Sequence, residues 1–109
     1  MDDEDQIRRR HIVEAVQAQE PTETEAWSDL DALSTQTVVD TVETFIEEIR
    51  IDGNTFSGPL LWYVVLHYGP AGEDQLVNSE SFPGRFEGHL DNDTPVIDRM
   101  LVDVSSFYQ

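Results

Sequence analysis

The chain has 109 residues, with 23 acidic and 6 basic side chains and a formal net charge of −17 when the histidines are neutral. This length suits one domain with one core. Apolar residues at 39% and aromatic residues at 9% exclude a fully disordered chain in spite of the charge. The sequence therefore predicts a single domain over residues 1–109, led by a charged segment, residues 1–5, that is expected to fray.

The basic residues are all arginine, and the chain has no lysine. Uncompensated charge opposes compaction in dilute buffer, whereas molar salt shortens the screening length to about 3 Å. This composition resembles that of proteins from salt-accumulating halophiles. An acidic mimic of nucleic acid would carry the same charge but has no reason to exclude lysine. The composition therefore favours a protein of a halophilic organism.

Several kinds of site and segment are missing from the sequence. Without cysteine there are no disulfides, thiolate metal sites or cysteine nucleophiles. The first 20 residues have no apolar core of a secretory signal. The longest uncharged apolar stretch, residues 56–66, is shorter than the roughly 20 residues that span a bilayer. We therefore expect a cytoplasmic location without membrane contact, or a virion if the protein is encoded by a virus.

Three helices are predicted in the first half of the chain. The first covers residues 4–19, where Asp5 and Arg9 have the favourable order for a helical ion pair. A loop over residues 20–25 separates it from a short second helix over residues 24–33. The third covers residues 35–50, because apolar residues recur there at spacings of four, three and four: Val38, Val42, Phe45 and Ile49.

The second half indicates a small antiparallel sheet. Asp52-Gly53 ends the third helix or turns a short hairpin. Residues 60–68 are apolar on both faces, which fits a central strand or a buried helix, and their aromatic and β-branched content favours the strand. Residues 75–77 and 85–90 look like short strands, separated by a turn at residues 81–84.

The C-terminal part, residues 95–108, has a helical stripe preceded by a capping Thr94 and by Pro95 in the first turn. Asn92-Asp93-Thr94 fits a glycosylation sequon but is interpreted as a turn. The predicted fold class is α+β, with about three N-terminal helices, a small antiparallel sheet in the second half and a C-terminal helix.

Few residues suggest catalysis. His11, His67 and His89 lie far apart and lack metal-ligand spacing, and His67 is expected to be a core imidazole with one hydrogen bond. A calcium loop starting at Asp91 is rejected because Val96 and Val102 replace its glycine and glutamate. No glycine-rich phosphate loop and no Gly-x-Ser-x-Gly motif is found. We therefore predict no enzyme, no catalytic, cofactor-binding or metal residues, and no cofactor.

The aromatic residues point to protein interaction, because aromatic side chains commonly anchor interfaces. The candidates are Trp62, Tyr63, Tyr68, Phe107 and Tyr108. For Trp62, a place in the core is at least as good an interpretation. The predicted function is thus a non-enzymatic interaction or assembly subunit of a halophilic organism, or a structural component of a virus of such a host. Its expected partner is another copy or another protein.

The alternative is a winged-helix-like transcription regulator, since three helices and a hairpin have that order. Its candidate nucleic-acid contacts are Arg8, Arg9, Arg10 and Arg50. The third predicted helix, however, carries an acidic outer face that would meet a polyanion: Asp40, Glu43, Glu47 and Glu48. Nucleic acid is therefore disfavoured as a partner.

Overall fold

The computed structural model describes residues 3–69 and 75–108, and half of these residues lie in strands. Its helices are α1 (Asp3–Gln17) and α2 (Trp27–Asp31). Its strands are β1 (Gln36–Thr44), β2 (Arg50–Asp52), β3 (Thr55–Tyr68), β4 (Leu76–Asp91) and β5 (Thr94–Val102). Short 3-10 helices cover Pro21–Glu23, Ile46–Glu48 and Ser105–Tyr108.

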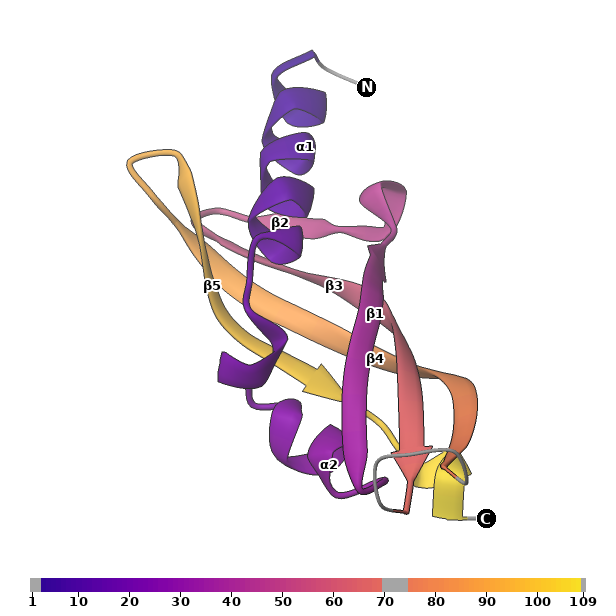
Figure 1. Cartoon of the computed structure of the whole chain (residues 1–109). Coiled ribbons are helices and arrows are strands. Elements are labelled where there is room, and N and C mark those ends of the chain that lie inside the picture. Colours follow the sequence, from indigo (N-terminus) through magenta and orange to yellow (C-terminus); the bar gives the residue numbers. More distant parts are fainter. Residues whose placement is uncertain (1–2, 70–74, 109) are drawn as a thin grey trace.

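The strands form one antiparallel sheet in the order β1-β3-β4-β5, with β2 paired to the beginning of β3 (Figure 1). The long β3–β4 ladder runs from the Thr55–His89 pair to the Tyr68–Leu76 pair. The sheet is strongly twisted and curls into a half-barrel, with α1 and α2 against its concave side (Figure 1). A sheet of this kind buries one face and leaves the other to solvent.

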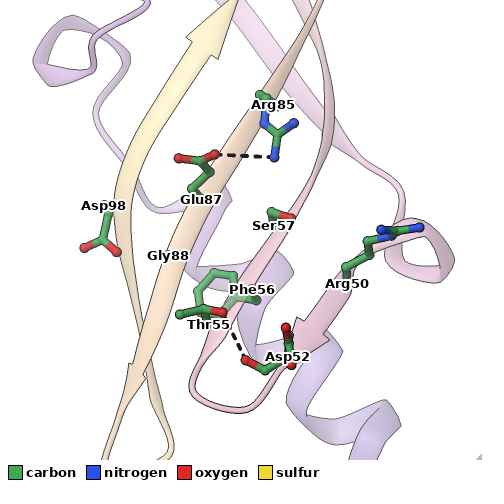
Figure 2. Close-up of a pocket in the computed structure, with 9 residues that line it drawn as sticks. All are labelled: Arg50, Asp52, Thr55, Phe56, Ser57, Arg85, Glu87, Gly88 and Asp98. Carbon is green, nitrogen blue, oxygen red and sulfur yellow. Dashed lines mark hydrogen bonds and ion pairs between the residues drawn. The ribbon is translucent and has the colours of Figure 1, made fainter.

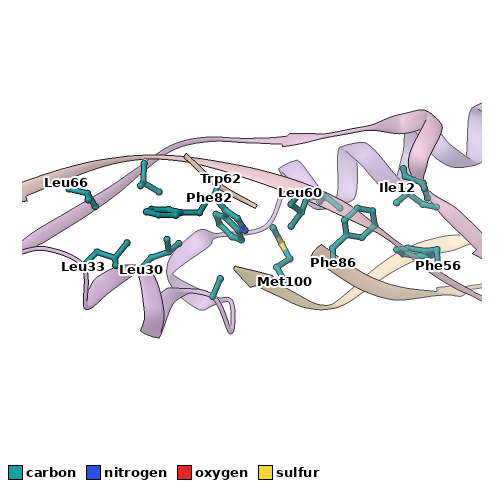
Figure 3. Packing of buried hydrophobic residues seen from close by; sticks show 14 residues of the cluster. Ile12, Leu30, Leu33, Phe56, Leu60, Trp62, Leu66, Phe82, Phe86 and Met100 are labelled. Atoms are coloured by element: carbon teal, nitrogen blue, oxygen red, sulfur yellow. The ribbon is translucent and has the colours of Figure 1, made fainter. Parts of the chain in front are cut away.

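The core lies between the concave face and the helices. Alternate residues of β3 point inward, including the fully buried Trp62, and they meet Ile12 of α1 and Leu30 of α2 (Figure 3). Phe82 and Phe86 fill the centre from β4. The indole Nε1 of Trp62 donates a hydrogen bond of 3.0 Å to the Leu101 carbonyl, so its polar atom is satisfied inside the core.

Helix α1 confirms the first predicted helix, and its Asp5–Arg9 ion pair forms at 2.7 Å. The same guanidinium also donates Nη1 hydrogen bonds to the carbonyls of Ile46, at 3.1 Å, and Ile49. Arg9 thereby joins α1 to the segment that leads into β2. Residues 1 and 2 of the expected leader lie outside the described residues, and residues 3–5 belong to α1.

The third predicted helix is wrong, because residues 36–44 form strand β1. Val39 pairs with Val64 and Thr41 with Tyr63, which leaves Asp40 as an unpaired bulge residue. The bulge shifts the alternation by one position, so Thr37, Val39 and Val42 all face the core. A spacing of three between two inward residues imitates a helix, although the β-branched composition of the segment favours a strand.

The predicted C-terminal helix is wrong for the same reason. Glu87 pairs with Arg99 and Gly88 with Ile97, so Asp98 is a bulge residue in β5. Ile97 and Met100 therefore both face the core at a spacing of three. Among the described residues after the strand, the helical structure is a single 3-10 turn, Ser105–Tyr108.

Of the other local predictions, some are confirmed and some are wrong. The hairpin at Asp52-Gly53, the strand over residues 60–68 and the turn at Asn92-Asp93 are confirmed. The turn at residues 81–84 is wrong, since β4 runs through it without a break. The second helix is shorter than predicted. A sheet-dominated half-barrel with two N-terminal helices thus replaces the predicted α+β arrangement with three helices before the sheet and one after it.

Within the described residues, no helix is both long enough and apolar enough to cross a membrane.

Candidate functional site

The solvent-facing side of the sheet gathers cationic and acidic side chains at the end near the β2–β3 turn. Strand pairing places them in two rows across the sheet. One row is Arg50, Ser57, Glu87 and Arg99, and the next is Asp52, Thr55, His89 and Val96. With the neighbouring Arg85 and Asp98, we call these residues the arginine face. It contains three of the six arginines in the chain.

The arginine face is hollowed by a groove of about 490 Å³ (Figure 2). A second groove of about 370 Å³ adjoins it and shares Arg50, Ser57 and Arg85. The short β2 strand makes one wall, and the β4–β5 hairpin makes the other. Arg50 lines both grooves from β2 and Arg85 lines them from β4, and in Figure 2 the guanidinium of Arg50 points away from Arg85.

His89 and Asp98 form a hydrogen-bonded pair on the β4–β5 hairpin. The Nδ1 atom of His89 lies 3.0 and 2.9 Å from the two carboxylate oxygens of Asp98. Asp98 continues the outward alternation from Val96, and the bulge makes Arg99 face outward as well. A carboxylate at Nδ1 favours the proton there, which leaves Nε2 as the proton acceptor. Both side chains are about half exposed, at 45% and 48%.

Glu87 holds two of the arginines. Its carboxylate lies 2.9 Å from Nε of Arg99 and 3.4 Å from Nη2 of Arg85. The hydrogen bond and charge of Glu87 raise the pKa of Arg99, so that guanidinium stays charged. Arg50 makes no ion pair within residues 3–69 and 75–108.

The charges of the arginine face balance locally. Arg50, Arg85 and Arg99 offset the three carboxylates of Asp52, Glu87 and Asp98. The region is thus electrically neutral in a chain whose net charge is −17. Among the described residues, no three His, Asp or Glu side chains are gathered as a metal site. What the arrangement offers chemically is anion contact by guanidinium groups and proton transfer at an imidazole.

The arginines proposed from the sequence are divided between two places. Arg50 lies in the groove. Arg8, Arg9 and Arg10 lie on α1, and Arg9 is engaged by Asp5 and by two backbone carbonyls. The structure therefore does not bring the four predicted nucleic-acid contacts together.

The aromatic interface candidates are also separated. Trp62 is in the core. Tyr63 lies on the solvent side of β3, where partial desolvation and the carboxylate of Glu43 raise its pKa. Tyr68 packs against the rim of the core at the end of β3. Phe107 packs edge-on against Phe82, whereas Tyr108 is exposed and touches Phe107. An interface at these four outer rings stays a prediction.

His89 could not be recognised as a site residue by its spacing, because its partner Asp98 is nine residues away. The feature of the sequence that could have identified this pair is the Asn92-Asp93 turn. Its two residues have positive φ angles of 51° and 66°, which suit a two-residue hairpin loop. A hairpin around that turn brings residues 89 and 98 to one face. His11 is exposed on α1. The Nδ1 atom of His67 lies 3.3 Å from the side-chain amide oxygen of Gln75.

Comparison with known proteins gives one match. Residues 3–108 match the model of a family described as "Predicted pPIWI-associating nuclease". No curated protein and no solved structure matches the chain.

The match corrects several functional predictions. It points to an enzyme with a nuclease-related function, which contradicts both the non-enzymatic assembly subunit and the winged-helix regulator. It gives no support to a halophilic, oligomeric or viral structural role, or to the exclusion of nucleic acid. The expectation of a protein partner agrees with the association named in the family description. Since the match covers nearly the whole chain, this protein belongs to the family of predicted pPIWI-associating nucleases.

Proposed function

We propose that the chain cleaves nucleic acid on the arginine face, with His89 as the group that moves the proton. The observation that carries this proposal is the His89–Asp98 pair, 2.9 Å apart, on the solvent-facing side of the sheet that also carries Arg85 and Arg99. Family membership supplies the reaction class. A half-exposed imidazole with a free Nε2 can reach a polymer that lies across a sheet surface.

RNA is the substrate that this set of groups suits best. An imidazole base can remove the proton of a ribose 2′-hydroxyl, whose oxygen then attacks the adjacent phosphorus. The bond to the 5′-oxygen breaks, and that oxygen takes a proton from the imidazolium, which restores neutral His89. The products are a 2′,3′-cyclic phosphate and a 5′-hydroxyl. Arg85 and Arg99, on the same side of the sheet as His89, would contact phosphate groups of the bound strand and stabilise negative charge there.

The net charge of the chain opposes this binding at long range, but the arginine face is locally neutral. At physiological ionic strength, charges more than about 8 Å away are largely screened. A strand of nucleic acid in the groove therefore meets mainly the local charges, which are three guanidinium groups and three carboxylates.

The test is cleavage of a labelled single-stranded RNA by purified parent chain and by His89→Gln. We expect a loss of about 100-fold or more in kcat for His89→Gln. Asp98→Asn keeps a hydrogen-bond partner but removes the charge, so its loss should be smaller. Arg85→Gln should mainly raise KM. His11→Gln, at an exposed histidine on α1, is the matched control and should cleave like the parent.

The identity of the products and the substrate range test the chemistry directly. A 2′,3′-cyclic phosphate end and resistance of a DNA of the same sequence are the expected results. Equal activity of the parent and His89→Gln would remove His89 from the mechanism. Cleavage of the DNA control at the same rate would exclude the 2′-hydroxyl as the nucleophile.

A further inference from the structure

The first half of β4 has an open edge at the opposite end of the sheet from the arginine face. On one side β4 pairs with β3 along its length, but on the other side β5 joins it only from the Gly84–Val102 pair onward. Within the described residues, no strand pairs with residues 76–83 on that second side. All six residues from 76 to 81 are exposed.

One hydrogen bond fixes the direction of the backbone groups along this edge. The carbonyl of Pro83 accepts a bond of 2.8 Å from the amide of Asp103, so Pro83 directs its polar atoms away from β3. In an antiparallel strand, N–H and C=O of one residue point to the same side, and the side alternates along the chain. Val77, Ser79 and Ser81 therefore present their N–H and C=O groups to the open edge.

The side chains at this edge differ from the rest of the surface. Residues 76–79 carry no charge, and Glu80 is the single charged residue between positions 76 and 83. Leu76 is 70% exposed and Val77 is 54% exposed. Soluble proteins usually guard an open edge with charged residues, bulges or a covering segment. An edge with a single charged residue and two exposed apolar residues is therefore the part of this acidic chain best suited to accept a strand.

We infer that the edge of β4 over residues 77–81 docks an extended segment of the associated pPIWI protein by strand addition. Backbone hydrogen bonds to Val77, Ser79 and Ser81 would supply affinity, and an apolar side chain opposite Val77 would supply selectivity. The family description names the kind of partner, and the unpaired backbone defines the conformation that the partner segment must adopt. This inference does not depend on the reaction proposed for the arginine face.

The experiment measures binding of the purified pPIWI protein encoded by the same genome to the parent chain, Ser79→Pro and Ser79→Ala. Proline removes the N–H donor at the centre of the edge. The strand should tolerate it, because Pro83 already occupies an equivalent edge-facing position in β4. Ser79→Ala keeps the N–H and is the matched control. We expect Ser79→Pro to weaken binding about tenfold, while Ser79→Ala binds like the parent.

Amide hydrogen exchange gives a second readout. Complex formation should slow exchange of the Val77, Ser79 and Ser81 amides by about tenfold or more, and leave the Ser57 and His89 region unchanged. The inference fails if the pPIWI protein does not bind, if it binds without protecting these amides, or if Ser79→Pro binds as well as Ser79→Ala. Protection that rises with the concentration of the chain alone would assign the edge to a second copy instead. RNA cleavage by Ser79→Pro, measured without partner, should equal that of the parent.

Discussion

At the scale of single residues, Gly84 shows how tightly the core and the sheet are fitted together. A Cβ atom at this position would lie 2.6 Å from Nε1 of Trp62 and would also overlap the Leu101 carbonyl. These are the two groups that form the hydrogen bond of the buried indole. Any side chain at residue 84 must therefore displace Trp62 or separate β4 from β5.

Gly84→Ala is expected to lower the free energy of unfolding by about 1–3 kcal/mol, the usual cost of overpacking. Urea unfolding followed by tryptophan fluorescence measures the change. Ser81→Ala, at an exposed position of the same strand, is the control and should change stability by less than about 0.5 kcal/mol. Equal midpoints for the two variants would contradict the close packing at residue 84.

Asp103 links the C-terminal turn to acid stability. Its carboxylate accepts a hydrogen bond of 2.9 Å from the Ser105 amide, and the Ser105 side chain and amide lower its pKa below the ordinary 3.8. The folded-state pKa is thus below the unfolded value. Its contribution to stability is present above pH 3.8 and disappears as the pH falls through the lowered folded-state pKa.

Asp103→Ala should accordingly destabilise the chain at pH 6 and lose its effect at the acid end of the range. Denaturant midpoints of parent and variant, measured at intervals between pH 6 and pH 3, should converge as the pH falls. Ser28→Ala, at an exposed residue of α2 without a titratable side chain, should give a constant difference from the parent. A parent-to-variant gap that stays constant or widens toward low pH would rule out the linkage at Asp103.

At the scale of elements, the two bulges explain why the sequence was misread. Each inserts one aspartate into an alternating strand, so inward residues on either side lie three positions apart. Where no bulge intervenes, as in residues 60–68, the strand was predicted correctly. The period of the pattern could not reveal a bulge, because the extra residue is identified only by the partner strand. The β-branched residues of β1 were the better guide.

The bulge in β1 predicts an unusual tolerance to deletion. Removing Asp40 lets Thr41 follow Val39 directly, and both keep their present partners on β3. Removing Val39 instead moves the Asp40 carboxylate opposite Val64, toward the core. We expect the Asp40 deletion to change stability by less than about 1 kcal/mol, and the Val39 deletion to cost more than about 3 kcal/mol or prevent folding.

Circular dichroism and urea unfolding of the two deletion variants measure this difference. A comparable loss of stability in both deletion variants would contradict this prediction and would mean that the sheet needs Asp40 for its curvature.

The candidate site could be predicted from the sequence only in part. Arg50 was identified, but as a contact of a helix that does not exist. Arg85, Glu87, His89 and Asp98 come together only through the register of β3, β4 and β5. That register depends on the turn at Asn92-Asp93 and on the bulge at Asp98, so neither composition nor spacing could supply it.

At the scale of the whole molecule, the chain is elongated. Its extents are 53, 24 and 19 Å, and its radius of gyration is 15.8 Å, against about 13 Å for a compact domain of this length. The long β3–β4 ladder causes this shape. Along β4, Ser79 at the centre of the open edge lies ten residues from His89, up to about 33 Å, and Ser81 lies four residues from Arg85, up to about 13 Å. A partner at the edge would therefore leave His89 accessible.

The net charge makes a prediction for the molecule as a whole. Seventeen excess negative charges repel one another in the folded chain, and raising the salt concentration screens that repulsion. The midpoint of thermal unfolding should therefore rise between 0.1 M and 1 M KCl. A double variant at exposed residues, Glu14→Gln with Glu23→Gln, should show a smaller rise. A midpoint that falls with salt would show that ion pairs outweigh repulsion.

The hydrogen bonds of Arg9 connect α1 to the segment that precedes β2. The carbonyls that accept these bonds belong to Ile46 and Ile49, and Ile49 immediately precedes Arg50 in the wall of the groove. A helix on the concave side thus sets the position of a cation on the convex side, through one guanidinium and a few backbone atoms. A substitution of Arg9 is therefore expected to shift Arg50 and to change the wall of the groove, although Arg9 itself does not line the groove.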